Sequence, residues 1–466
     1  MNIEPSQIAF SCAQRQALLA SLPPCSIWLV FAGQEQIRNR DVDFPFRPQS
    51  DFWYLTGFNE PDATLALVSA DLIARLPAEW KTQYLINDTA HNETAQSQAW
   101  LWLRPKDPLQ ERWQGRRLGV DAAVAELKVQ QAWSHEQRDE MLAQLVGFAD
   151  QIHISFSMMD YWSPYLPDWM AKAQRKIRQG GQVPSQVVNA DEKLHGLRLI
   201  KSSYEIVQLR HAAQLSVQAH LAAMQATRPG AQEYQVQAAL EAKAHQLGAR
   251  RMAFNSIVAG GERACILHYT ENQACLSEGE LVLIDAGAEW QGYAGDISHT
   301  YPVSGRFTKP QRQLYELVLA AQHAVIAMIK PGIAYEILHE TAARVITEGL
   351  LKLGILTGAL EESLKSQAYK AYFMHGTGHW LGLDVHDVGP YKLQGQSIQL
   401  QPGMLVTVEP GLYIDQDAAE VAACWRGIGI RIEDDVLVTE QGCEVLNHGL
   451  PRSCEEIEQW MQQNRQ

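Results

Sequence analysis

The sequence has no long apolar run, no excess of positive charge and few cysteines. No segment approaches the roughly 20 consecutive apolar residues that a membrane helix needs, so we expect no membrane-spanning helix. The formal net charge of -14 argues against a nucleic-acid partner, because binding to phosphates requires a basic surface. The seven cysteines form no C-x-x-C pair, which argues against both a disulfide framework and a zinc knuckle.

The N-terminus also lacks the features of a secretory leader. The stretch MNIEPSQIAF has neither a basic segment nor an apolar core. Hydrophobic residues make up 46% of the chain and charged residues 20%, as in ordinary globular proteins. We therefore expect a cytoplasmic protein that binds neither membrane nor nucleic acid.

The chain of 466 residues is too long for a single hydrophobic core and indicates two or three domains. In the N-terminal part, short apolar runs alternate with helical patterning, which predicts an α/β domain. We place the boundary within 190–197 and divide the chain into 1–192, the α/β domain, and 193–466. The predicted strands of the first domain contain SIWLVFAG, FWYLTGF, TLALVSA and TQYLIND, and its helices are expected around 121–128 and 134–145.

The second domain shows the same order of elements twice. A capping box begins a helix at Ser202–Glu205 and again at Thr308–Gln311. Each half then reads helix, Pro-Gly, helix, Leu-Gly and strands, which predicts a duplicated unit with a pseudo-two-fold axis; chance similarity of amphipathic helices is the alternative. The predicted strands lie at 251–258, 265–270, 281–285 and 296–303 in the first half, and around 373, 385, 405–409 and 428–438 in the second.

Most of the tryptophans lie in the first domain, including Trp100, Trp102 and Trp113. Core packing is the commoner reason for a tryptophan, and an exposed one would indicate a subunit interface. Both interpretations are open at this point.

The stretch 281–303, LVLIDAGAEWQGYAGDISHTYPV, places two aspartates beside apolar runs. If the hairpin loop is centred on Trp290-Gln291, Asp285 lies opposite Asp296 with Cβ atoms about 4.5–5.5 Å apart. Two carboxylates that close repel each other unless one is protonated or a cation lies between them. A pair of divalent cations would suit this geometry. The alternatives are a protonated pair, or a different register with one aspartate exposed.

A glycine-rich stretch at 373–389, FMHGTGHWLGLDVHDVG, contains three histidines. His375 and His379 have the i, i+4 spacing of a helical zinc motif, but two glycines lie between them and the glutamate of H-E-x-x-H is missing. The glycine spacing also differs from the dinucleotide fingerprint. We expect a loop that presents imidazoles to a cavity, with an ordinary hydrogen-bonded core role as the alternative for each histidine.

Two later strands deliver glutamates, in LVTVEPGLY at Glu409 and in GIGIRIEDD at Glu433. In the second strand Arg431 and Glu433 face the same way, and a salt bridge is the alternative role for Glu433. Two aspartates, one histidine and two glutamates in one domain favour Mn²⁺ or a similar divalent ion over a thiolate site.

The ordered set Asp285, Asp296, His379, Glu409 and Glu433 resembles the dinuclear metallopeptidases of pita-bread fold. The sequence around these residues is similar to that of bacterial aminopeptidase P, a family of Xaa-Pro aminopeptidases. The resemblance runs from about Asn39 to Glu440 and is carried by SDFWYLTGFNEP, CILHYTEN, LIDAG, GYAGDI, HWLGLDVHDVG, VEPGLY and RGIGIRIEDD.

The resemblance implies a smaller N-terminal α/β domain, serving substrate access and oligomerisation, followed by a pita-bread catalytic domain. It implies release of the N-terminal residue from peptides with proline second, by attack of a hydroxide held between two divalent ions, expected to be Mn²⁺. Asp296 and Glu433 would bridge the ions, Asp285 would complete one shell, and His379 and Glu409 the other. Glu409 would also shuttle the proton. The resemblance further implies a homo-oligomer, either a dimer or a tetramer.

Four further residues match family positions near the reacting peptide. His268, His375 and His386 would hold the substrate or stabilise the tetrahedral intermediate, and Arg431 would support the bridging glutamate. Two positions depart from the family: Gly378, where relatives often carry serine, and Phe254, where many carry tyrosine.

Three other functions are compatible with the same fold. A prolidase would cleave only Xaa-Pro dipeptides, which depends on what blocks the far end of the cleft. A non-catalytic pita-bread binding protein would have lost its ligands, and all five are present here. A creatinase-like hydrolase would work without metal.

Overall fold

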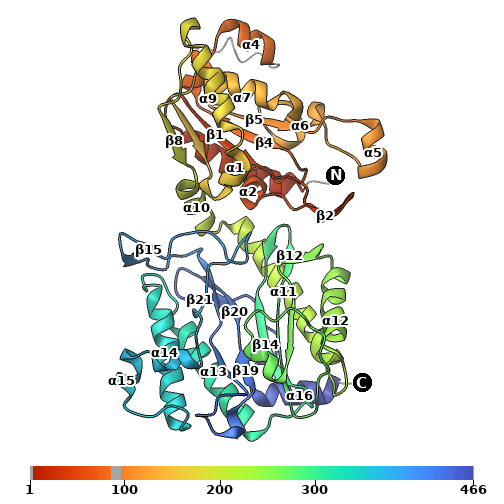
Figure 1. The fold of residues 1–466 in the computed structure, drawn as a ribbon, viewed down its shortest axis with the longest axis vertical. Coiled ribbons are helices and arrows are strands. Elements are labelled where there is room, and N and C mark those ends of the chain that lie inside the picture. The colour runs from red at the N-terminus through yellow and green to blue at the C-terminus, as the bar shows by residue number, and fades with distance from the viewer. Residues whose placement is uncertain (1–3, 86–95, 465–466) are drawn as a thin grey trace. The chain divides into compact units, whose positions relative to one another are not determined.

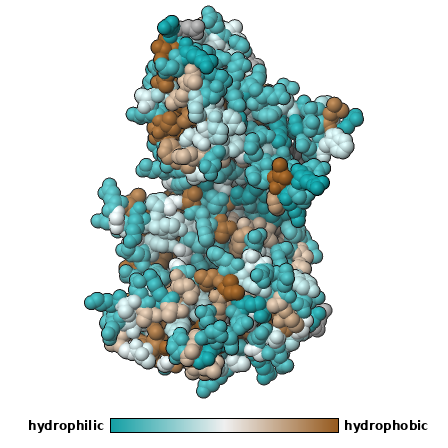
Figure 2. Space-filling model, in the orientation of Figure 1, coloured by the Kyte–Doolittle hydropathy of each residue, from teal (hydrophilic) through white to brown (hydrophobic). Residues whose placement is uncertain are grey.

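The computed structural model describes residues 4–85 and 96–464, and the chain divides into two compact units, Met1–Leu197 and Arg198–Gln466. Within the described residues, no helix combines the length and hydrophobicity needed to cross a membrane. On the face shown in Figure 2, hydrophilic residues cover most of the surface, and the hydrophobic ones occur in small groups between them.

The first unit is built on a six-stranded mixed sheet with the order β6-β5-β4-β1-β7-β8. Strand β1 lies in its centre, antiparallel to β4 and parallel to β7. A separate two-stranded hairpin joins β2 and β3. The strands are β1 (Ser26–Phe31), β2 (Ile37–Asn39), β3 (Val42–Asp43), β4 (Thr64–Val68), β5 (Gln98–Leu103), β6 (Gln131–Ser134), β7 (Gln151–Ile154) and β8 (Gln186–Asn189).

Helices cover this sheet, and side chains of α3, α4, α7 and α9 share one hydrophobic core with alternate residues of β1, such as Ile27 and Leu29. Trp100 and Trp102 belong to that core and are fully buried, whereas Trp113 on α5 is 87% exposed. The helices of this unit, shown in Figure 1, are α1 (Pro5–Ala20), α2 (Ser50–Thr56), α3 (Ala70–Arg75), α4 (Ala78–Tyr84), α5 (Pro108–Gln114), α6 (Val120–Leu127), α7 (Arg138–Val146), α8 (Met159–Trp162), α9 (Leu166–Arg175) and α10 (Asp191–Leu199), which continues to the second unit.

Two strand predictions in this unit are wrong. FWYLTGF forms most of helix α2, which ends at Gly57 in the left-handed conformation with φ of 60°. This helix is buried on nearly every side, so its sequence shows no polar face, and a short apolar run cannot be told from a buried strand. The beginning of TQYLIND lies in helix α4, and its end lies outside the described residues.

The second unit contains two pairs of packed helices, each followed by strands. Figure 1 shows α11 and α12 beside β12 and β14, and α13 and α14 beside β20 and β21. This order agrees with the predicted repeat. The helices are α11 (Ser203–Ala226), α12 (Glu233–Gln246), α13 (Lys309–Met328), α14 (Glu336–Lys352), α15 (Leu360–Lys365) and α16 (Cys454–Asn464).

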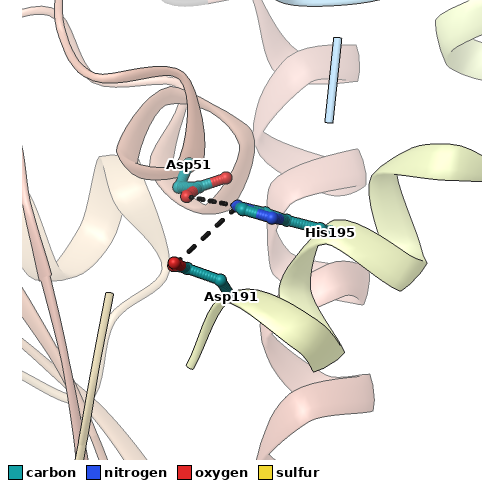
Figure 3. A group of neighbouring side chains, drawn as sticks. All are labelled: Asp51, Asp191 and His195. Atoms are coloured by element: carbon teal, nitrogen blue, oxygen red, sulfur yellow. Dashed lines mark ion pairs between the residues drawn. The ribbon is translucent and has the colours of Figure 1, made fainter. Parts of the chain in front are cut away.

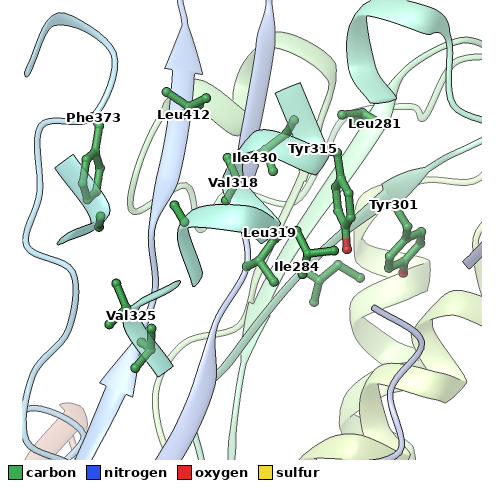
Figure 4. Close-up of a cluster of buried hydrophobic side chains, with 14 of the residues drawn as sticks. Leu281, Ile284, Tyr301, Tyr315, Val318, Leu319, Val325, Phe373, Leu412 and Ile430 are labelled. Atoms are coloured by element: carbon green, nitrogen blue, oxygen red, sulfur yellow. The ribbon is translucent and has the colours of Figure 1, made fainter. Parts of the chain in front are cut away.

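The strands of the second unit form several small antiparallel sheets, among them β10-β11-β14, β13-β12-β9, β17-β20-β21 and β18-β19. Helix α13 packs between them, and Figure 4 shows its Tyr315, Val318 and Leu319 among side chains of β11, β14, β18 and β19. The strands are β9 (Arg251–Met252), β10 (Ile257–Gly260), β11 (Leu281–Ala286), β12 (Ala288–Trp290), β13 (Tyr293–Ala294), β14 (Ile297–Pro302), β15 (Lys392–Leu393), β16 (Gln396–Ser397), β17 (Leu405–Val408), β18 (Gly411–Ile414), β19 (Ile428–Arg431), β20 (Asp434–Val438) and β21 (Cys443–Val445).

Both predicted capping boxes are present. The Ser202 and Thr308 hydroxyls accept hydrogen bonds from the backbone N–H groups of Glu205 and Gln311, whose side chains bond back. Three predicted strands are wrong, because 265–270 and the segments around 373 and 385 are irregular or 3₁₀. The 3₁₀ turns of the chain are η1 (His135–Gln137), η2 (Phe156–Met158), η3 (Ile177–Gln179), η4 (Gly261–Cys265), η5 (Ala368–Ala371) and η6 (Ala423–Trp425).

The register predicted for the hairpin at 281–303 is also wrong. Asp285 pairs with Ser298, not with Asp296. The tip is a two-residue turn at Gln291-Gly292, both with positive φ, so the hairpin is centred one residue later than expected. The partner shifts by two positions, which keeps Asp296 on the face that carries Ser298 and Asp285.

Candidate metal centre

The two strands of the β11–β14 hairpin approach each other very closely at Gly287 and Gly295, a contact that we call the glycine crossing. Asp285 lies two residues before Gly287, and Asp296 lies directly after Gly295. A Cβ on Gly287 would lie 1.6 Å from the Gly295 carbonyl oxygen, and one on Gly295 would lie 2.6 Å from Ser216 Oγ on α11. Only glycine fits at either place, because real Cβ contacts are never so short. The crossing therefore brings both aspartates close together at the end of the paired β11–β14 strands.

His379 lies in the irregular glycine-rich segment beside β17. The His379 N–H donates to Thr407 Oγ1 at 3.1 Å, and the Thr407 N–H donates to the His379 carbonyl at 2.9 Å. His379 Nδ1 lies 3.0 Å from the Trp380 carbonyl, so that contact assigns the proton to Nδ1. Nε2 is then left to face Asp296 Oδ2 at 3.4 Å and Glu409 Oε1 at 3.7 Å.

Each of the two glutamates lies in the short connection between two consecutive strands. Glu409 comes directly after β17, and its N–H donates to the Thr377 carbonyl at 2.8 Å. Glu433 lies between β19 and β20, where its N–H donates to the Ser298 carbonyl at 3.0 Å and Ser298 Oγ donates to its Oε2 at 2.7 Å. Potential ligand atoms of Asp296, His379 and Glu433 all lie within 4.8 Å of one another.

One cavity of about 650 Å³ in the second unit is lined by every site residue that the sequence singled out. Phe254 and Gly378, the two departures from the family, also line it. The residues that it gathers from the prediction are Asp285, Asp296, His379, Glu409, Glu433, His268, His375, His386 and Arg431.

Arg431 connects the acids to the neighbouring strands. Its side chain is buried, and Nη2 lies 2.7 Å from Asp285 Oδ2 while Nε donates to Ser298 Oγ at 2.9 Å. The guanidinium thus holds Asp285 directly and Glu433 through Ser298. Burial lowers the pKa of Arg431, but Tyr413, Asp285 and Glu409 outweigh this and keep it well above its ordinary value.

The acids of the cavity are costly to ionise together. Burial raises the pKa of Asp296 to about 6 and that of Glu409 to about 7, with repulsion from neighbouring carboxylates adding to the effect. Burial and the other three acids raise the pKa of Glu433 well above its ordinary value. The positive charge in the site is too small to balance Asp296, Glu409 and Glu433 when all three are ionised.

The histidines of the cavity differ in basicity. Burial lowers the pKa of His379, but its hydrogen bond to Asp296 and the charges of Asp296 and Glu409 outweigh this and raise it to about 9. Burial, with the nearby Arg431 charge, lowers the pKa of His375 to about 4. Burial and His379 also lower the pKa of His386.

Tyr413 is a member of the site that the sequence analysis did not single out. Its hydroxyl accepts from Arg431 Nη1 at 2.9 Å and lies 2.8 Å from His375 Nε2. His375 Nδ1 lies 2.7 Å from the Gly376 carbonyl, so Nε2 is left to accept the Tyr413 proton. The tyrosine ends the VEPGLY stretch, but nothing in its local pattern distinguishes it from a core residue.

The donor set fits hard or borderline divalent cations. Asp285 Oδ1 is buried and has no hydrogen-bond partner, although Oδ2 of the same carboxylate binds Arg431. A buried carboxylate oxygen without a donor is expensive unless a cation meets it. Four carboxylates and one imidazole are ligands that Mn²⁺ and Zn²⁺ accept.

A second group of potential ligands lies in the first unit. Figure 3 shows His195 Nε2 between Asp51 and Asp191, at 3.5 Å from Asp51 Oδ2 and 3.9 Å from Asp191 Oδ1. Contacts between one histidine and two carboxylates account for this arrangement.

Comparison with known proteins identifies related sequences across nearly the whole chain. Residues 207–440 match the model of metallopeptidase family M24, and residues 12–154 match that of the aminopeptidase P N-terminal domain. An Xaa-Pro aminopeptidase of Escherichia coli K12 is 42% identical over 96% of both chains. Human Xaa-Pro aminopeptidase 3 is 33% identical over 92% of this chain and 80% of its own.

Solved structures agree with this relationship. An aminopeptidase PepP of Pseudomonas aeruginosa superposes with a TM-score of 0.91 at 42% identity, covering 100% of this chain and 99% of the other. A zinc-substituted E. coli aminopeptidase P in complex with product has a TM-score of 0.91 at 40% identity, covering 98% and 99%. The predicted fold, a smaller α/β domain followed by a pita-bread domain, is confirmed.

Proposed function

The chain belongs to metallopeptidase family M24, in the group that carries an aminopeptidase P N-terminal domain, and on this premise we propose that it is an Xaa-Pro aminopeptidase. It is a metal-dependent exopeptidase that releases the residue preceding proline. The observation that carries this function is the cavity that gathers all five candidate ligands, together with 42% identity to an Xaa-Pro aminopeptidase over nearly the full length.

In this proposal five side chains would hold two divalent ions: Asp296 and Glu433 would contribute to both ions, Asp285 to one of them, and His379 and Glu409 to the other. Such a pair, when bound, supplies Lewis acidity and lowers the pKa of water toward neutrality. The orphaned Oδ1 of Asp285 and the raised pKa values of Asp296, Glu409 and Glu433 support this assignment, since cations would stabilise the ionised forms. Mn²⁺ is the ion we propose, and Zn²⁺ suits the same donors.

The chain's own residues bind the peptide and transfer a proton from water to the leaving nitrogen. Glu409 reaches into the cavity and takes a proton from the attacking water, then returns it to the departing proline nitrogen. His268, His375 and His386 line the same cavity and hold the peptide or its tetrahedral intermediate. Because the pKa of His375 is lowered, its neutral ring receives a hydrogen bond from Tyr413, which Arg431 orients.

Selectivity for proline follows from what the tertiary amide lacks. An Xaa-Pro bond has no N–H, so peptidases that use this hydrogen lose a contact, whereas a cavity shaped around the ring does not. The free α-amino group of the first residue would be attracted to the acidic cluster, which makes the enzyme an exopeptidase.

Assembly and location are also part of the proposal. We expect a homo-oligomer, a dimer or tetramer, in which the N-terminal domain serves subunit contact and substrate access; the exposed Trp113 supports such a role. All seven cysteines are free thiols, which suits a cytoplasmic protein. Light scattering tests the assembly, and a strict monomer would contradict it.

The decisive experiment is reconstitution of metal-free protein with Mn²⁺, Zn²⁺ or Co²⁺, followed by assay on Gly-Pro and Arg-Pro-Pro. We expect metal-dependent release of arginine from the tripeptide. Cleavage of the dipeptide alone would establish a prolidase instead. A protein that binds no metal and cleaves neither peptide would be a non-catalytic pita-bread protein, and metal-free turnover would point to the creatinase type.

A further inference from the structure

A buried cluster of opposite charges lies at the start of the second unit. Asp387 Oδ1 lies 2.5 Å from Arg198 Nη2, and Asp387 Oδ2 lies 3.0 Å from Lys201 Nζ. The side chains of these three residues are no more than 2% exposed. Arg198 Nη2 also lies 2.7 Å from Asp384 Oδ2. Removing so many charges from water is costly, and a hydrophobic cluster of equal volume would often be as stable.

The charge cluster anchors residues 381–389, a segment that no helix or strand stabilises. Residues 381–389 contain no helix or strand, yet Val385 and His386 of this segment line the catalytic cavity. The Asp387 N–H donates to the Trp380 carbonyl at 2.8 Å, and the Ala294 N–H donates to the Gly382 carbonyl at 2.8 Å. The second of these bonds joins the segment to β13 at Ala294, two residues before Asp296. His386 lies in the part of the segment between Gly382 and Asp387.

Close contacts leave the segment little freedom around the cluster. A Cβ on Gly382 would lie 2.1 Å from Asp387 Oδ2, and one on Gly389 would lie 2.9 Å from Leu199 Cδ1. The Lys201 N–H also donates to the Gly403 carbonyl at 2.8 Å, just before β17 leads to Glu409. The residues 198–201 thus contact the two backbone segments that deliver His386 and Glu409.

We propose that Arg198, Lys201 and Asp387 are positioning residues that fix the His386 imidazole in the cavity; we call them the Asp387 clamp. Asp387 is the next residue after His386, so holding its carboxylate also holds the backbone that carries the imidazole. The His386 ring centre lies 4.2 Å from that of His379, and a displacement of about 1 Å would spoil its contact with a bound peptide. The inference rests on the proposed function of the cavity.

The test is a double-mutant cycle on the metal-loaded protein, with Arg-Pro-Pro as substrate. Lys201→Met leaves Asp387 paired with Arg198 and should lower kcat/KM roughly tenfold, mainly through KM, with metal content unchanged. In a His386→Ala background the same change should have almost no effect, because both act through one imidazole. Lys201→Arg should restore activity.

A control variant at an exposed ion pair shows whether the loss of any ion pair in the second unit lowers activity. Arg210→Met breaks an ion pair with Glu444 at 2.6 Å, and neither residue lines the catalytic cavity. We expect wild-type kcat/KM from this variant in both backgrounds. If Lys201→Met does not fold, Asp387→Asn takes its place in the same cycle.

Two results would overturn the inference. One is a double variant whose fold loss in kcat/KM equals the product of the losses of Lys201→Met and His386→Ala. The other is a wild-type kcat/KM for Lys201→Met. A crystal structure of Lys201→Met gives a readout that does not depend on activity. We expect the His386 ring to be displaced, and an unchanged ring would refute the clamp. Inactivity of the wild-type protein on all Xaa-Pro peptides would refute the proposed function instead, and the crystal structure would still decide the positioning.

Discussion

In the metal-free form of this protein, the free energy of unfolding should decrease as the pH rises from 5 to 8. Burial raises the pKa of Asp296 from 3.8 to about 6 and that of Glu409 from 4.5 to about 7, so the folded metal-free site binds protons that the unfolded chain has lost. For an acid with a raised pKa, folding carries no penalty below the unfolded value and the full penalty above the folded value. His379, with a pKa raised to about 9, adds a stabilisation that is complete below 6.5 and disappears through 9, which has the same sign.

The loss of stability over this pH range can be estimated from the pKa change of a single acid. A difference of about 2 pKa units corresponds to about 3 kcal/mol. Asp296 and Glu409 interact, so their penalties do not add, and we take about 3 kcal/mol for the site. In a domain of this size that energy shifts the melting temperature by roughly 6–12 °C.

The measurement is calorimetry of chelated and metal-loaded protein at pH 5, 6, 7 and 8, because the difference between the two forms removes pH effects from the rest of the chain. We expect this difference to widen with pH. Glu409→Gln should reduce the slope in the chelated protein, and the exposed Glu278→Gln should not. A difference that is constant, or that narrows toward pH 8, would refute the reasoning.

Three further predictions concern the site and the residues around it. Asp296→Asn or Glu433→Gln should lower turnover of Arg-Pro-Pro more than about 100-fold with little change in fold, and near-normal turnover would contradict the bridging assignment. Tyr413→Phe removes the hydroxyl between His375 and Arg431 and should cost about tenfold in kcat/KM; an unchanged value would show that this contact does not serve the reaction. Glu205→Gln should raise the melting temperature at pH 8 but not at pH 4, since burial raises the pKa of Glu205 to about 7, and equal effects at both pH values would count against it.

Features with a local cause could be predicted from the sequence. The capping boxes at Ser202 and Thr308 depend on residues three apart, and both formed as expected. The five candidate ligands were found because acids beside apolar strands need a partner, and because their order resembles a family. That resemblance, and with it the fold and the activity, is confirmed by the relatives.

Features set by distant contacts were missed. The hairpin register depends on the contact of Gly287 with Gly295 and on α11 beneath them, neither of which the local pattern contains. The second helix of the chain looks like a strand because tertiary packing buries nearly all of it. Tyr413 became recognisable only when Arg431 and His375 were seen on either side of its hydroxyl.

The glycine crossing at Gly287 and Gly295 also separates the hairpin into two mechanically distinct parts. Below it, β11 and β14 belong to one small sheet, and beyond it β12 and β13 belong to another with β9. A substitution in the β12–β13 part should therefore disturb Asp285 and Asp296 less than a substitution at Gly287 or Gly295. An insertion within β11 or β14 would instead shift the pairing that sets Asp285 opposite Ser298.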